Sequence, residues 1–171
     1  RRVREIFALT PEILDAPDGI DASGIAGHIR FDEVSFSYDD QRNVLDTISF
    51  EARTGELVAL VGLTGAGKTT IASLVPRFFV PGSGRVLIDD VDTARYSLQT
   101  LREQIALVPQ QPVLFTGTIA DNIRYGRLDA SDADVKAAAR DANLDDFVTR
   151  LPQGYQTPVH EAGATLSGGE R

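Results

Sequence analysis

Two apolar runs and two alternating stretches stand out along this chain. Leu57–Val61 form an unbroken apolar run of strand length, and Ile105–Val108 form a second one. Such runs are typical of strands buried on both faces of a parallel sheet. Apolar residues alternate with polar ones over 29–38, in two registers that indicate a bulge, and again over 48–52. These alternating stretches predict an antiparallel pair ahead of the first apolar run.

Other segments have the spacing of helices. The apolar positions predict helices over 97–104, 118–125, 132–143 and 145–151. Ser131 and Asp134 resemble a capping box that opens the third of these. The residues expected to face inward on that helix are Val135, Ala138, Ala139 and Ala142.

The start of the chain has a different composition. Residues 1–9 carry apolar positions on one helical face, and residues 10–27 are rich in Pro, Gly, Asp and Ala, as linkers are. We therefore expect the ordered domain to begin near His28. A turn over 81–84 precedes a short strand over 85–88.

A glycine-rich loop follows the first apolar run. The segment from Gly62 to Thr69 matches G-x-x-x-x-G-K-[ST], between a predicted strand and a helix with an apolar face. Its glycines allow successive backbone N–H groups to converge on phosphate oxygens. Lys68 can reach the outer phosphates, and the Thr69 hydroxyl can join a Mg²⁺ coordination sphere. The motif predicts a nucleoside triphosphate site and leaves the reaction open.

Three further residues are candidates on position alone. Tyr38 lies at the turn end of the antiparallel pair, where its ring either stacks on adenine or covers the core. Gln110 follows the second apolar run, where its amide oxygen can complete a Mg²⁺ shell or orient a water. The alternative is a solvated loop glutamine, which is commoner for an isolated Gln. Asp89 ends an apolar strand and superficially resembles the acid that holds Mg²⁺, but the strand is short, follows a turn and continues into further acidic residues, so we do not interpret Asp89 as a metal ligand.

Composition narrows the class of protein. The 171 residues are enough for one core, and the net charge of −8 argues against nucleic acid as the main partner. No apolar run approaches the about 18 residues of a membrane-spanning helix, and the start does not resemble a signal peptide. The absence of Cys excludes disulfides and thiolate metal sites and fits a reducing compartment.

The end of the chain carries a second glycine motif. Leu166-Ser167-Gly168-Gly169 resembles a helix start with free N–H groups, which suits an anion. Two phosphate sites on one chain suggest that the second serves the nucleotide of another chain.

With these motifs the sequence strongly resembles the nucleotide-binding domain of exporter-type ATP-binding cassette (ABC) transporters. The resemblance places adenine stacking on Tyr38, the Q-loop glutamine at Gln110 and the LSGGQ signature at Leu166, Ser167, Gly168, Gly169 and Glu170. It also assigns Glu161, in the exporter segment 159–163, to contacts with intracellular loops of the membrane domain. The ATP-binding residues that it implies are Tyr38, Gly62, Leu63, Thr64, Gly65, Ala66, Gly67, Lys68, Thr69 and Thr70, with Thr69 and Gln110 as Mg²⁺ ligands.

The resemblance implies an α/β fold: a P-loop NTPase (RecA-like) core, an N-terminal antiparallel β subdomain and an inserted α-helical subdomain, truncated at the C-terminus. The implied domains are a helix tail and linker at 1–27, the β subdomain and P-loop core at 28–110, and the helical subdomain at 111–171. The implied partners are ATP, an upstream transmembrane domain of the same polypeptide and a second nucleotide-binding domain in a head-to-tail dimer. The expected location is the cytoplasmic face of the cell membrane.

Three departures from the family pattern affect the functional prediction. Glu170 stands where Gln is usual, His160 replaces a Gly, and the sequence ends at Arg171, before the Walker B aspartate, the catalytic glutamate and the switch histidine. The leading hypothesis is an ATPase domain that drives export, and the alternative is a module that binds ATP without turnover. A GTPase or small-molecule kinase would leave the LSGGE segment unexplained, and no N-K-x-D guanine signature occurs.

Overall fold

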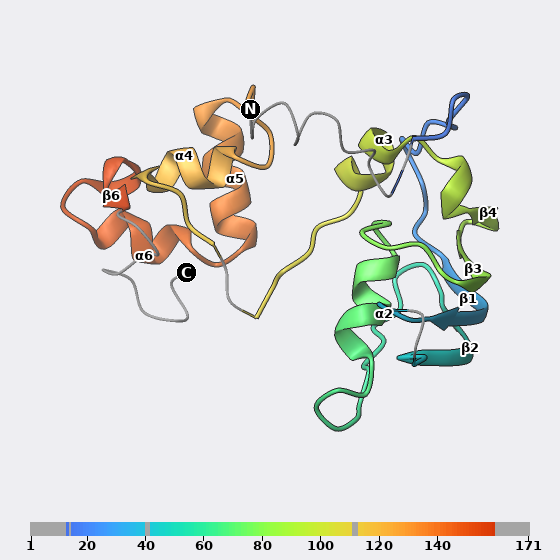
Figure 1. Ribbon diagram of the computed structural model, residues 1–171. Coiled ribbons are helices and arrows are strands. Elements are labelled where there is room, and N and C mark those ends of the chain that lie inside the picture. The colour runs from blue at the N-terminus through green and yellow to red at the C-terminus, as the bar shows by residue number, and fades with distance from the viewer. Residues whose placement is uncertain (1–12, 14, 40–41, 111–112, 160–171) are drawn as a thin grey trace, which may run out of the picture. The chain divides into compact units, whose positions relative to one another are not determined.

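The computed structural model describes residues 13, 15–39, 42–110 and 113–159. The chain divides into two compact units, residues 1–107 and 108–171, and each is described by itself (Figure 1). The first unit is built on a β-sheet, and the second is mainly helical. The division into domains expected from the sequence stays a prediction.

Four antiparallel strands form the sheet of the first unit. They are β1 (Ile29–Phe36), β2 (Leu45–Ala52), β3 (Ser83–Ile88) and β4 (Val91–Asp92), in the order β2-β1-β3-β4. The pairing of β1 with β2 confirms the antiparallel pair predicted from the alternating pattern. β3 confirms the short strand expected after the turn. The polar turn of β3 and β4 has positive φ at both Asp89 and Asp90, as a two-residue hairpin turn requires.

A bulge in β1 explains the two registers of its apolar residues. The pairing with β2 shifts between Phe31 and Val34, and Glu33 between them has φ 50°. The extra residue lets both Phe31 and Val34 face the core. Gly84 of β3 lies against this bulge, where a Cβ would be 2.3 Å from the Glu33 carbonyl oxygen. Position 84 therefore requires glycine.

The apolar face of the sheet packs against α2 (Lys68–Leu74). Phe31 stacks on Phe50 at 4.7 Å between ring centroids. The buried side chains of this core cluster are Phe31, Val34, Phe36, Leu45, Leu74 and Val86. The helix that begins at the end of the glycine-rich loop is thus anchored to the sheet by its apolar side.

A second cluster joins the predicted linker to the sheet. Ala22 is fully buried with Ile88, Tyr96 and Leu101. The Ile20 N–H donates to the Arg95 carbonyl oxygen at 2.8 Å. The expectation that order begins near His28 is therefore wrong, because Ile20 already bonds to Arg95 and Ala22 already packs in this cluster.

The two apolar runs differ from their prediction. No strand is assigned within Leu57–Val61 or Ile105–Val108 in the part of the chain that the structure describes. Leu57 and Val61 are 96% and 93% exposed, and Val108 is 90% exposed. The prediction of buried strands is wrong for this structure, because among the described residues no neighbouring strand pairs with either run.

Two further elements complete the first unit. The 3₁₀ helix η1 (Thr93–Arg95) follows β4, and α3 (Leu98–Glu103) confirms the helix expected over 97–104. The Arg102 guanidinium donates to the carbonyl oxygens of Pro76 and Arg77 and lies 5.3 Å from the centre of the Phe78 ring. These contacts connect α3 with the end of α2.

The second unit confirms three predicted helices. They are α4 (Ile119–Arg124), α5 (Asp132–Asp141) and α6 (Asp145–Arg150). The 3₁₀ helix η2 (Gly154–Gln156) and a small pair of strands, β5 (Gly117–Thr118) and β6 (Pro158–Val159), complete the unit. Val135 and Ala139 are buried on α5 as expected, whereas Ala138 and Ala142 are exposed. The predicted apolar face of α5 is therefore too wide.

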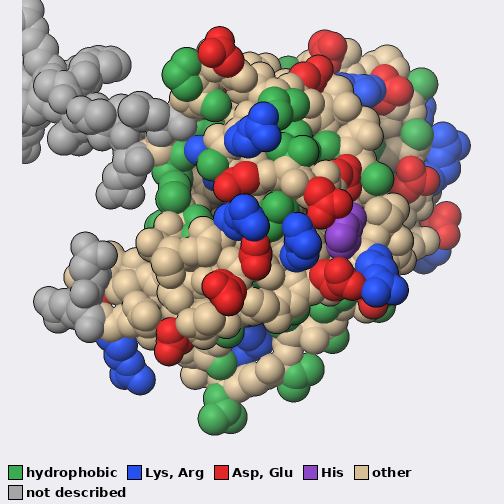
Figure 2. All heavy atoms as spheres, turned by 90° about the vertical axis from the view of Figure 1, so that its right-hand side faces the viewer, with side chains coloured by type: hydrophobic (Ala, Val, Ile, Leu, Met, Phe, Trp, Pro, Cys, Tyr) green, Lys and Arg blue, Asp and Glu red, His purple; other side chains and the backbone are tan. Residues whose placement is uncertain are grey.

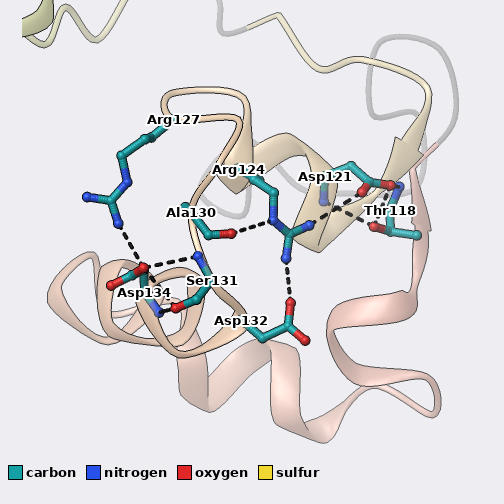
Figure 3. Close-up of polar contacts among 8 residues, drawn as sticks. All are labelled: Thr118, Asp121, Arg124, Arg127, Ala130, Ser131, Asp132 and Asp134. Carbon is teal, nitrogen blue, oxygen red and sulfur yellow. Dashed lines mark hydrogen bonds and ion pairs between the residues drawn. The ribbon is translucent and has the colours of Figure 1, made fainter.

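Polar contacts fix the starts of α4 and α5 (Figure 3). Ser131 and Asp134 form the predicted capping box, and Thr118 and Asp121 form another. Hydrogen bonds from Ser131 and Thr118 lower the pKa of Asp134 and Asp121 below the usual carboxyl range. Arg124 donates to the Ala130 carbonyl oxygen and to Asp132, which connects the two helix starts.

Candidate nucleotide-binding site

The glycine-rich loop is exposed except at its end. Gly65 and Gly67 have φ of 84° and 82°, and the Ala66 N–H donates to the Leu63 carbonyl oxygen at 3.1 Å. Gly67 is the N-cap of α2, and its carbonyl oxygen accepts the first helical hydrogen bond from the Ile71 N–H at 2.9 Å. The chain therefore turns tightly into the helix, as a phosphate-binding loop requires.

Lys68 points back over this loop. Its ammonium Nζ donates to the carbonyl oxygens of Gly62 and Leu63, each at 2.7 Å. These are backbone oxygens of the loop itself, and no carboxylate pairs with Lys68 among the described residues. A phosphate oxygen can replace a carbonyl oxygen as acceptor and gain a charge-assisted bond. The cation is thus in place for an anion bound in the loop.

Thr69 and Thr70 have different environments. The Thr69 side chain is exposed and makes no hydrogen bond in the described part of the chain, so its hydroxyl is available to a ligand. Thr70 is 4% exposed, and its Oγ1 lies 3.0 Å from the Tyr38 hydroxyl. This hydrogen bond joins the end of the hairpin to the start of α2.

Tyr38 lies where the sheet meets the loop. Its ring makes edge contacts with Phe36 and Phe79, at 4.8 Å and 5.1 Å between centroids, and more than half of the residue is exposed. An open pocket of about 340 Å³ adjoins it, lined by Ile13, Phe36, Ser37, Tyr38, Phe79 and Val80. The ring is therefore held by neighbours and still accessible, so both sequence-based interpretations of Tyr38 stay open.

Asp89 bonds to the backbone of the segment that leads into β1. Its carboxylate accepts hydrogen bonds from the N–H groups of Ala26 and His28, at 2.6 Å and 2.9 Å. These bonds connect the incoming chain to the β3–β4 turn and occupy both carboxylate oxygens of Asp89.

The remaining predicted residues do not extend this site within the described chain. Gln110 is exposed and belongs to the second unit, whereas the loop belongs to the first, so its role stays a prediction. Glu161 and the signature residues Leu166–Glu170 lie outside the described residues.

No three His, Cys, Asp or Glu side chains gather as a metal site among the residues described. Within the first unit, the Thr69 hydroxyl, phosphate oxygens and water would be the donors for a Mg²⁺ ion at this loop. This donor set fits the ion, because Mg²⁺ keeps several waters and takes few protein oxygens.

Charges around the sheet are mixed. Arg85 pairs with Asp32 at 2.8 Å and Arg30 with Asp90 at 3.2 Å. Figure 2 shows acidic and basic side chains interspersed on the face that it draws. This view therefore shows no continuous basic surface of the kind that a nucleic-acid backbone needs.

Comparisons with known proteins identify the family. The family model described as ABC transporter matches residues 45–171. The chain belongs to the ABC transporter family. It is an exporter-type nucleotide-binding domain, and its fold is that of a P-loop NTPase with an antiparallel β-sheet near the N-terminus and helices. In such a domain the loop at 62–69 is in the position expected of the P-loop.

Three similar proteins illustrate this membership. An ATP-dependent lipid A-core flippase of Chromohalobacter salexigens is 47% identical over 98% of this chain and 29% of its own length. An ATM1-type heavy metal exporter of Novosphingobium aromaticivorans is 48% identical over 98% of this chain and 28% of its own length. A solved bacterial Atm1-family ABC exporter with ATP bound has 46% identity and a TM-score of 0.91, covering 99% of this chain and 30% of that one.

This ABC chain spans less than a third of the length of these relatives. No helix of its described part is long and apolar enough to cross a membrane.

Sequence reasoning missed the residues that support the ABC loop from the hairpin. Leu45 contacts Gly67, and Phe36 and Phe79 hold the Tyr38 ring. All three are ordinary apolar residues at sheet and turn positions. No local pattern distinguishes them, because the contacts of Leu45 with Gly67 and of Phe79 with Tyr38 join segments more than 20 residues apart, and alternation along a strand does not single out Phe36.

Proposed function

We propose that the P-loop binds Mg-ATP and that the complete dimeric transporter hydrolyses it to drive export of a substrate across a membrane. One observation carries the proposal: the Lys68 ammonium lies over the loop, bonded to the Gly62 and Leu63 carbonyl oxygens. A lysine held in this way needs no large movement to meet the outer phosphates. The ABC family membership supports ATP as the nucleotide.

The residues around the loop have different roles in binding the nucleotide. The N–H groups of 62–70 bind phosphate oxygens, Lys68 supplies a positive charge, and the Thr69 hydroxyl orients the bound ion. Mg²⁺, when bound, neutralises charge on the outer phosphates. Tyr38 offers its exposed ring to the adenine, at about 1–3 kcal/mol for such stacking. Gln110 would join the ion or orient the attacking water.

In the complete protein, we propose a head-to-tail pair of these domains. ATP then lies between the P-loop of one subunit and the signature Leu166, Ser167, Gly168, Gly169 and Glu170 of the other. Glu161 contacts an upstream transmembrane domain, and the pair lies at the cytoplasmic side of that membrane. The exporter names of the relatives support this assembly.

A second candidate is an ATP-binding module without turnover. It is favoured by the surroundings of the loop, where no carboxylate pairs with Lys68 among the described residues, because activation of water needs a carboxylate. A titration of the 171-residue chain with Mg-ATP and Mg-GTP tests the nucleotide, and we expect this chain to bind ATP and to hydrolyse it negligibly. A phosphate-release assay on the complete transporter separates the two candidates, because steady turnover supports the ATPase and binding without phosphate release supports the second candidate. Absence of ATP binding would overturn the proposal.

Cross-linking tests the dimer in the complete transporter. Thr64→Cys and Ser167→Cys should cross-link between subunits when ATP is trapped, because the two segments face one nucleotide. Glu170→Gln should not reduce the yield, since it removes a carboxylate near phosphate. Cross-linking within one subunit, or none with ATP present, contradicts the head-to-tail arrangement.

A further inference from the structure

The last glycine of the P-loop lies directly against the β-sheet. A Cβ on Gly67 would lie 2.6 Å from Cδ2 of Leu45 and 3.2 Å from the carbonyl oxygen of Val44. The first distance is well below any normal contact between carbon atoms. Gly67 is buried, although most of the loop is exposed. The start of β2 therefore occupies the space beside the Gly67 Cα.

The surface that meets Gly67 is itself held in place. Leu45 is 3% exposed and belongs to the core cluster with Phe31 and Leu74. The Val44 N–H donates to the Phe36 carbonyl oxygen at 2.7 Å, which fixes the backbone at the entry of β2. Leu45 thus has little freedom to move away from the loop, because the neighbouring core is close-packed.

Gly67 in turn sets the geometry of the groups that follow it. Its φ of 82° turns the chain into α2, and its carbonyl oxygen accepts the Ile71 N–H. Lys68 and Thr69 come next in the chain. A shift of Gly67 would therefore move the N–H groups, the ammonium and the hydroxyl that meet the phosphates.

We propose that Leu45 is a positioning residue for the phosphate loop: its side chain holds Gly67 so that the loop keeps its binding geometry before nucleotide arrives. The inference rests on the proposed binding of ATP at this loop. Leu45 touches no nucleotide in this scheme and acts through Gly67. The β hairpin then contributes to phosphate binding as well as to the core.

The test is a double-mutant cycle in the 171-residue chain, with the Kd for Mg-ATP measured by calorimetry. Gly67→Ala adds the Cβ that collides with Leu45, and Leu45→Ala removes the atom that it meets. Gly67→Ala should raise the Kd in both backgrounds. We expect the factor of increase to be at least about fivefold smaller in the Leu45→Ala background than in the wild type, a coupling within the range found for residues in contact. Equal factors in both backgrounds would overturn the proposal.

Val86→Ala is the matched control. Val86 is buried in the same cluster, and the three atoms nearest a Cβ at position 67 belong to Leu45 and Val44 instead. Leu45→Ala should weaken ATP binding several-fold more than Val86→Ala does, and Leu45→Met, which keeps the volume, should restore it. Equal losses for Leu45→Ala and Val86→Ala would mean that Leu45 is only a core residue.

Amide hydrogen exchange of the loop separates this inference from the proposed function. In the ligand-free chain, Leu45→Ala should speed exchange of the two hydrogen-bonded amides that flank Gly67, those of Ala66 and Ile71, at least about fivefold more than Val86→Ala does. If the wild type fails to bind ATP, the proposed function falls, and the exchange comparison still decides whether Leu45 holds the loop. Equal exchange in the two variants overturns the positioning role.

Discussion

The antiparallel sheet and the two apolar runs are both rich in apolar residues, yet only the sheet buries its apolar side chains in a core. Phe31 and Val34 of the sheet are at most 2% exposed, whereas Leu57 and Val61 of the first run are more than 90% exposed. Short turns join β1 to β2 and β3 to β4, and β1 also pairs with β3, which lies about 50 residues further along the chain. Parallel strands need partners brought by long crossover connections. Composition alone therefore does not bury a segment, because its neighbours must be present as well.

This difference has a consequence for the site. The P-loop lies between an exposed run on one side and a packed helix on the other, since α2 belongs to the core cluster through Leu74. Leu45 of β2 contacts the loop's last glycine, Gly67, and Tyr38, in the turn between β1 and β2, bonds to Thr70 at the start of α2. The sheet, and not the preceding apolar run, supports the loop in the described chain.

The largest expected effect lies within the sheet. Phe31→Ala should lower the free energy of unfolding by about 3–5 kcal/mol, because it leaves a cavity against Phe50. Val61→Ser, at an exposed position, should change it by less than about 0.5 kcal/mol. Urea unfolding followed by circular dichroism measures both. Similar losses for the two variants would mean that the apolar run is packed in solution and would break the comparison.

Lys68→Ala should show the opposite pattern. The charge-assisted bonds of its ammonium to phosphate should contribute about 1.5–3 kcal/mol to ATP affinity, while the free energy of unfolding should change little because Lys68 bonds only to loop carbonyls. Calorimetry and urea unfolding on the same preparation give the two values. Unchanged ATP affinity would remove Lys68 from the site.

Tyr38 tests the boundary between sheet and loop. Tyr38→Ala should lose about 1–3 kcal/mol of ATP affinity. Tyr38→Phe keeps the ring and loses only the hydroxyl contact with Thr70, which should cost at most about 1 kcal/mol. Mg-ATP titrations of the two variants compare stacking with the hydrogen bond. If Ala and Phe behave alike, the ring is structural.

The smallest effect on stability is expected at the capping boxes, which consist of hydrogen bonds between exposed polar groups. The pKa of Asp134 is lowered mainly by the hydrogen bond from Ser131, so its contribution to stability is present above the unfolded pKa. That contribution is lost as the pH falls below about 4. Thermal unfolding of the wild type and Asp134→Asn between about pH 6 and about pH 3 measures it. The variant should lose part of the pH dependence, and identical profiles would show that the bond contributes nothing.

Local patterns predicted much of this fold. The hairpin partner strands, the bulge in β1 and the capping box of Ser131 all depend on residues close in sequence. The burial of Ala22 and the exposure of Val61 were not predicted. Ala22 is buried by Ile88, Tyr96 and Leu101, which are distant in sequence, and among the described residues no strand pairs with the run that contains Val61. For the site, the motif predicted the loop and Lys68, and it could not predict the acceptors that Lys68 uses or the contact of Leu45 with Gly67.

Gly84 has a consequence for how this domain tolerates mutation. Any side chain there would collide with backbone atoms of Asp32 and Glu33, which cannot rotate away as a side chain can. The bulge in β1 and the glycine in β3 therefore depend on each other sterically, although 51 positions of the sequence separate Glu33 from Gly84. In a library of all single substitutions, position 84 should retain only its glycine, and a change there becomes acceptable only together with removal of the bulge. Removal of the bulge would turn Phe31 or Val34 out of the core, so neither half of the pair can vary alone.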